Sequence, residues 1–108
     1  FNVPSLSVCF MFLRNSIFVK TEMFDENIFM YCEDLDLCRR IGRISKTQYV
    51  PTEAVIHRYN KESYRSTKLL RYHIKSALYY FNKWGWFFDA ERRKMNKETL
   101  KAIDEMNK

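Results

Sequence analysis

Glycine and proline are scarce in this sequence, with two of each among 108 residues. Long flexible linkers are therefore not expected, and the length suits one domain or part of one. The three cysteines (Cys9, Cys32 and Cys38) are odd in number and lack Cys-x-x-Cys spacing. This argues against a disulfide framework or a zinc cluster and indicates a reducing, cytoplasmic compartment. Apolar runs are too short to span a membrane, and no signal peptide is expected.

Large side chains and positive charge are what the sequence does contain. It is 46% hydrophobic and 17% aromatic, enough to bury a core, and its formal net charge is +6. Such a charge favours anionic partners such as phosphates, acidic lipids or nucleic acid, although a solvated basic surface would give the same count. Acids gather in residues 22–36, and bases dominate residues 58–83. The chain begins inside an apolar stretch without methionine, so we expect a fragment of a longer protein.

Hydrophobic periodicity predicts both strands and helices. A strand buried on both faces is expected at 7–14, with short extended stretches at 47–50 and 54–57. Helices are expected at 15–20, 29–41, 67–83 and from an Asp89 cap to about Met106. In the second helix, acids come first and bases last, the order that the helix dipole favours. The predicted inward stripe of the third helix is Leu70, Ile74, Ala77, Leu78 and Phe81.

Motifs at fixed spacing run through the first half of the chain. An apolar stretch ends at Arg14, Phe-Asp-Glu stands at 24–26, and Phe-Met-Tyr with Glu-Asp, Asp-Leu-Cys and Arg occupies 29–40. Val50-Pro51 and His57 complete the series. Single matches are Phe18, Ala54 and Ile56. With these motifs, residues 7–57 resemble glycosyltransferase family 2, in particular its bacterial rhamnosyltransferase-like members, which build surface polysaccharides.

The chain departs from the family pattern at three glycine positions. Ser7-Val8 stand where a glycine usually precedes the first apolar run, and Glu22-Met23 replace a Gly-Gly pair before Phe-Asp-Glu. The glycine after the acidic helix is displaced to Gly42. These departures concern loop geometry more than chemistry.

The resemblance implies an α/β fold, here a partial GT-A glycosyltransferase domain with few short strands and the acidic helix. Residues 1–62 would be the acceptor-side part of that catalytic domain, and residues 63–108 a helical C-terminal extension. The family's nucleotide-binding strands and Asp-x-Asp metal motif lie upstream of the matched segment. We therefore expect residues 1–108 alone to be inactive.

The resemblance also assigns site residues in the full-length enzyme. Asp34 would be the general base that takes the proton of the acceptor hydroxyl, and Glu33 would orient it or bind the acceptor. The alternative is that both acids only stabilise a helix N-terminus. His57 would complete a Mn²⁺ or Mg²⁺ site at the donor diphosphate, or would be a hydrogen-bonded histidine without a metal. Asp36 is expected to support the helix start or the loop, or to contact the acceptor. Independently of the resemblance, Arg58 and Arg65 stand in a basic loop before a helix, which suits phosphate contacts or a solvated surface. No cofactor is expected in residues 1–108 by themselves.

The expected partners are a nucleotide-sugar donor and a saccharide or lipid-linked acceptor, and not nucleic acid. Aromatic residues at 79–88, flanked by bases, suit a peripheral contact at the inner face of the plasma membrane, or core and homodimer packing. The competing interpretation is a non-catalytic basic and aromatic module that binds an anionic membrane surface or nucleic acid. A purely structural helical domain gives no reason for the spacing of Glu33-Asp34 and His57.

Overall fold

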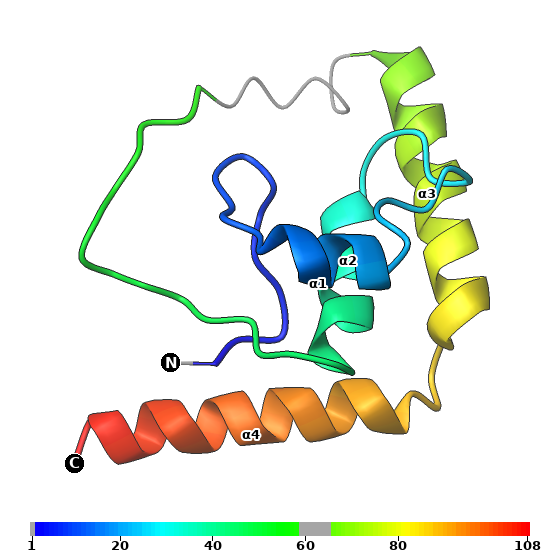
Figure 1. Cartoon of the computed structure of the whole chain (residues 1–108). Coiled ribbons are helices and arrows are strands. Elements are labelled where there is room, and N and C mark those ends of the chain that lie inside the picture. The colour runs from blue at the N-terminus through cyan, green and yellow to red at the C-terminus, as the bar shows by residue number, and fades with distance from the viewer. Residues whose placement is uncertain (1, 59–65) are drawn as a thin grey trace.

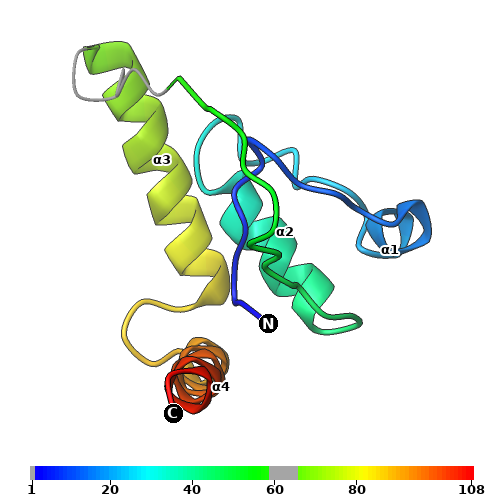
Figure 2. The ribbon, with the colours of Figure 1, turned by 90° about the vertical axis from the view of Figure 1, so that its left-hand side faces the viewer.

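Helices dominate the computed structural model, which describes residues 2–58 and 66–108. They are α1 (Asn15–Lys20), α2 (Glu33–Gly42), α3 (Thr67–Trp84) and α4 (Ala90–Met106). Figure 1 shows α2 at the centre, with α3 beside it and α4 crossing one end of the molecule. Figure 2 shows α1 projecting away from the other helices. The chain between α2 and residue 58 is an irregular segment that runs away from the helices (Figure 1).

The expected α/β fold is wrong for this chain. The described residues contain no sheet, and their only β-pairing is an isolated antiparallel bridge between Asn2 and Gln48. Residues 7–14 form a turn and irregular chain, with Phe12 88% exposed, and residues 54–57 are irregular and exposed. A strand needs a neighbour to pair its backbone groups. Within the described ranges, these apolar runs do not lie beside such a neighbour.

The helix predictions are confirmed, with small shifts at the ends. Ser66 accepts a hydrogen bond from the backbone N of Leu69 and starts α3, and Asp89 accepts one from the backbone N of Arg92 and starts α4. Gly85 ends α3 with φ at +112°, a conformation that side chains rarely adopt. The acidic helix begins at Glu33 instead of residue 29, because the two residues before it have left-handed backbone angles.

The predicted inward stripe of α3 is wrong at three of its five positions, while Ala77 and Phe81 are partly buried. Leu70, Ile74 and Leu78 are all more than 40% exposed, while Ser76 and Tyr80 are the buried residues of this helix. The face of α3 that packs on α2 is therefore polar and aromatic. Among the described residues, the buried apolar core is small and consists of Ile28, Leu37, Cys38, Ile41 and Tyr80.

Polar pairs replace much of the apolar core between the helices. Arg39, from α2, is buried and bonds both Asp89, which precedes α4, and the Tyr80 hydroxyl of α3. The radius of gyration is 15.2 Å, larger than the roughly 13 Å expected for a compact domain of this length. In the described part of the chain, no helix combines the length and apolar character needed to cross a bilayer.

Candidate functional site

The turn that leads into α2 has an uncommon backbone. Tyr31 and Cys32 have φ angles of 65° and 61°, in the left-handed region that β-carbon atoms disfavour. Two contacts with α3 hold the turn. The Ser76 hydroxyl donates a short hydrogen bond to the carbonyl of Met30, and the Tyr31 ring stacks on His73 with ring centroids 4.5 Å apart. Strained backbone of this kind often marks functional sites.

Glu33 and Asp34 follow this turn directly, as the first two residues of α2. Both are half-buried. One Asp34 oxygen accepts a 2.8 Å hydrogen bond from the backbone N of Leu35, and Oε2 of Glu33 is buried without a hydrogen-bond partner. Burial, followed by the charges of Asp34 and Glu33, raises the pKa of the Cys32 thiol. The entrance to α2 is therefore negatively charged and holds a carboxylate oxygen that lacks a donor.

Asp36 has a different environment, because it is completely buried. Its Oδ2 accepts from Arg40 at 2.9 Å, and its Oδ1 lies 2.7 Å from Nζ of Lys83 and accepts from Nε1 of Trp84 at 2.8 Å. Three partners thus surround the carboxylate and join α2 to the end of α3. The structure places Asp36 in a supporting position, and a direct contact with an acceptor stays a prediction.

Arg40 extends this network to the turn after α1. Its Nη1 donates to the carbonyls of Thr21 and Met23, the latter at 2.6 Å. Glu22 and Met23 in this turn have φ angles of 62° and 61°. These are the two residues that stand where the resembled family has Gly-Gly, so the backbone keeps a conformation that suits glycine although the side chains differ.

Asp25 is a structural residue whose role the sequence did not reveal. It accepts hydrogen bonds from Nζ of Lys83 at 2.8 Å and from the Tyr79 hydroxyl at 2.9 Å, both in α3. Burial acts to raise the pKa of Asp25, but the bonds from Lys83, the Asn27 backbone and Tyr79 outweigh it and hold that pKa below its usual range. In the sequence, Asp25 is marked only by its place in the Phe-Asp-Glu motif, and that motif does not predict which side chains it contacts.

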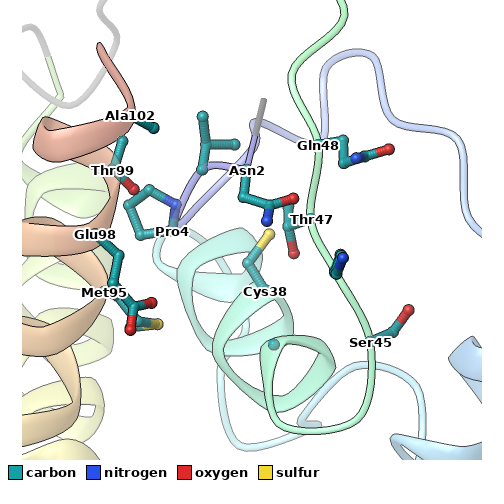
Figure 3. A pocket seen from close by; sticks show the side chains of 13 residues that line it. Asn2, Pro4, Cys38, Ser45, Thr47, Gln48, Met95, Glu98, Thr99 and Ala102 are labelled. Atoms are coloured by element: carbon teal, nitrogen blue, oxygen red, sulfur yellow. The ribbon is translucent and has the colours of Figure 1, made fainter. Parts of the chain in front are cut away.

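A pocket of about 510 Å³ with mixed polar and apolar walls lies beside the C-terminal half of α2 (Figure 3). Its walls are the N-terminal segment, residues 45–48 and one side of α4. Cys38 and Gly42 line it, and Asp34 stands one turn before Cys38 in the same i, i+4 row of α2. The hydroxyl of Thr47, another lining residue, is buried without a hydrogen-bond partner. The pocket therefore offers unsatisfied hydrogen-bonding capacity on the same side of α2 as Asp34.

The remaining predicted site residues are His57, Arg58 and Arg65. His57 and Arg58 are exposed in the irregular segment after α2, and Arg65 lies outside the described residues. Within residues 2–58 and 66–108, no group of three histidine, cysteine or acidic side chains is arranged to hold a metal ion. The metal-binding role of His57 stays a prediction.

Comparison with known proteins gives one informative relationship. The chain is 43% identical over 74 residues to Rhamnosyltransferase WbbL of Escherichia coli (strain K12). The alignment covers 66% of this chain and 28% of that protein. No protein-family profile matches the chain, and no solved structure matches it. The chain is thus related in sequence to a glycosyltransferase and spans less than a third of that relative's length.

Proposed function

We propose that this chain is the acceptor-side part of an inverting glycosyltransferase of family 2. The enzyme would move a sugar from a nucleotide-diphosphate donor to a saccharide or lipid-linked acceptor in surface polysaccharide synthesis. The observation that carries the proposal is the 43% identity over 74 residues to a rhamnosyltransferase. The pair of carboxylates at the strained entrance to α2 supports it, because acceptor activation needs a base in a fixed position.

Asp34 is the base in this proposal. The acceptor hydroxyl gives its proton to the Asp34 carboxylate while its oxygen forms a bond to the anomeric carbon. The bond from that carbon to the diphosphate breaks on the opposite side, so the configuration inverts. The backbone N–H of Leu35 occupies one Asp34 oxygen at 2.8 Å, which fixes the carboxylate. Contacts with α3 hold the turn before it, which favours a pre-organised base.

Glu33 and the pocket beside α2 are proposed to bind the acceptor. The buried Oε2 of Glu33 lacks a donor, and a sugar hydroxyl would supply one. The pocket continues the Asp34 row of α2 by one turn, a rise of about 6 Å, to Cys38. Amide and hydroxyl side chains such as those of Asn2, Gln48 and Thr99 suit the hydroxyl groups of a saccharide.

The division of labour along the chain is part of the same proposal. Residues 1–62 would belong to the catalytic part and residues 63–108 would be a helical extension that supports it. Contacts between the two parts, such as Lys83 with Asp25 and Asp36, are suited to that support. His57 is proposed to help hold Mn²⁺ or Mg²⁺ near the donor diphosphate. Among the described residues, no three histidine, cysteine or acidic side chains are grouped so that they could hold such an ion. The protein would work in the cytoplasm.

The test is a transfer assay on the longest protein that contains this chain. Nucleotide-activated rhamnose is the first donor to try, because the related protein is a rhamnosyltransferase. We expect transfer to a saccharide or lipid-linked saccharide acceptor, with the anomeric configuration inverted in the product, as read by NMR. Residues 1–108 alone should give no transfer. Retention of configuration, or no transfer from any of a panel of nucleotide-sugars, would contradict the proposal.

A further inference from the structure

The connection between α3 and α4 is fixed at both ends. At one end, Trp84 lies under two guanidinium groups, with Arg39 and Arg43 at 4.5 and 4.6 Å from its ring centroid. At the other end, Asp89 is buried and forms two hydrogen bonds with Arg39. Only four residues separate these anchors, so the connection has little freedom to fold back onto the protein.

The residues between the anchors carry large aromatic side chains that face solvent. Phe87 is 78% exposed and Phe88 is 92% exposed, and Trp86 beside them is 43% exposed. We call Trp86, Phe87 and Phe88 the aromatic loop. Arg92 and Arg93 of α4 donate to the carbonyls of Trp86 and Phe87 at 3.2 and 3.1 Å. These bonds hold the backbone of the loop. The exposed phenyl rings form an apolar patch, and patches of this kind often mark interaction sites.

Positive charge continues from the loop along α4. Arg93, Lys97 and Lys101 stand at i, i+4 and i+8, and together with Leu100, which is 62% exposed, they line one side of the helix. We call this side the basic face. Its acids are Asp104 and Glu105, the latter 3.8 Å from Lys101. The other side of α4, with Met95 and Ala102, lines the pocket beside α2. Figures 1 and 2 show α4 at one edge of the molecule.

We propose that the aromatic loop and the basic face bind a membrane surface that carries anionic lipids. Phe87 and Phe88 would enter the interface between head groups and acyl chains, and the basic face would lie against the lipid phosphates. A helix flanked by exposed aromatic rings, with cations along one side, has the chemistry that this interface selects. The inference concerns a surface separate from the Asp34 region and does not depend on transferase activity.

Two other occupants fit less well. A second copy of the chain in a two-fold contact would bring one basic face against another, and like charges would repel. A single-stranded nucleic acid would match the cations and could stack on the aromatic rings. However, the aliphatic Leu100 on the basic face and the pairing of Trp86 with Phe81, 5.0 Å between centroids, leave less stacking surface.

The test is flotation of the full chain with lipid vesicles. We expect binding to vesicles of phosphatidylcholine and phosphatidylglycerol in equal parts, loss of binding to pure phosphatidylcholine, and weakening with added salt. The double variant Phe87→Ser with Phe88→Ser and the double variant Lys97→Glu with Lys101→Glu should each lower the vesicle affinity by at least about tenfold. Circular dichroism should show unchanged helix content, because all four side chains are exposed.

Matched controls separate this surface from general stickiness and general charge. Phe12→Ser with Ile56→Ser removes two apolar side chains that are 88% and 99% exposed elsewhere, and Lys68→Glu with Arg71→Glu makes the same charge change on α3. Both controls should bind vesicles within about threefold of the unchanged chain. Equal losses in the controls would overturn the proposal. So would a lack of binding to the anionic vesicles, loop-dependent binding of single-stranded oligonucleotides in their place, or a dimer that only the loop variants disrupt.

Discussion

Arg39 of α2 and Asp89, the residue that caps α4, form a buried ion pair with Nη2 and Oδ1 2.8 Å apart. Both side chains are at most 3% exposed. The same Asp89 carboxylate also accepts a 3.0 Å bond from the backbone N of Arg92 in the first turn of α4. One carboxylate therefore fixes the position of α4 and caps it, in a protein whose apolar core is small.

Removing the Asp89 carboxylate should destabilise the fold strongly. Asp89→Ala leaves the buried guanidinium of Arg39 without its counter-charge, which typically costs about 3–5 kcal/mol. Urea unfolding followed by circular dichroism would measure the loss. Glu98→Ala is the matched control, because Glu98 pairs with Lys94 at 4.0 Å on the surface and should contribute less than about 1 kcal/mol. Equal losses for the two variants would show that the Asp89 pair is not a central contact.

The same pair predicts acid sensitivity. The hydrogen bond from Arg39 is the largest influence on Asp89 and lowers its pKa from 3.8 to about 2. A carboxyl group whose pKa is lower in the folded state stabilises the protein above its unfolded pKa, and this contribution is lost as the pH falls through the folded pKa. Stability should therefore decrease between about pH 4 and pH 2, with Asp25 acting in the same direction.

Urea midpoints measured across this pH range would test the assignment. The fall should be smaller in Asp89→Asn, which has no carboxyl group to titrate at this position, than in the unchanged chain. An equally steep fall in Asp89→Asn would mean that other groups cause the acid sensitivity.

The turn after α1 should be improved by glycine. Met23 has a φ of 61° and is 52% exposed, so its side chain contributes little packing while its backbone is in a costly conformation. Met23→Gly should raise the free energy of unfolding by about 0.5–1 kcal/mol, once the extra entropy of glycine in the unfolded chain is included. Glu26→Gly is the control, because its φ is not positive, and it should be destabilising. A loss of stability in Met23→Gly would contradict the account of this turn.

Asp36 should matter for folding more than for chemistry. Asp36→Asn keeps the shape but removes the negative charge that Arg40 and Lys83 share, and should cost about 2–4 kcal/mol. Thermal unfolding by circular dichroism would measure this. In the full-length enzyme, its effect on turnover should follow the folded fraction, and should be milder than that of Asp34→Asn. An Asp36→Asn protein as stable as the unchanged chain would contradict the supporting role that the contacts of Asp36 imply.

The helices could be predicted from the sequence because their signals are local. The caps Ser66 and Asp89 and the terminator Gly85 lie within a few residues of the groups that they satisfy. The strands could not be predicted correctly, because an apolar run such as 7–14 becomes a strand only when another strand pairs with it. The inward face of α3 was mispredicted for a similar reason, because burial depends on the packing partner. The apolar residues Leu70 and Ile74 have regular helical spacing, but the helix packs through its polar and aromatic side.

The candidate site was predictable as a motif but not as a geometry. The resemblance pointed to Glu33-Asp34, and the structure adds the strained turn that precedes them. The partners of Asp36 come from distant sequence, since Trp84 lies 48 residues away, and no local pattern marks such a pair. The left-handed backbone angles of Tyr31 and Cys32 could not be predicted from the sequence either, because neither residue type favours a positive φ.

The most direct test of the central claim is the turnover of Asp34→Asn in the longest protein that contains this chain. The amide keeps the size of the side chain and can still accept the bond from the backbone N of Leu35, but it cannot take the proton of the acceptor. Asp104→Asn, an exposed change on α4, is the control. We predict that Asp34→Asn folds normally, binds donor with unchanged affinity and loses about 10²–10⁴ in rate, while the control keeps its activity. A folded Asp34→Asn protein with near-normal turnover would contradict the assignment of Asp34 as the base.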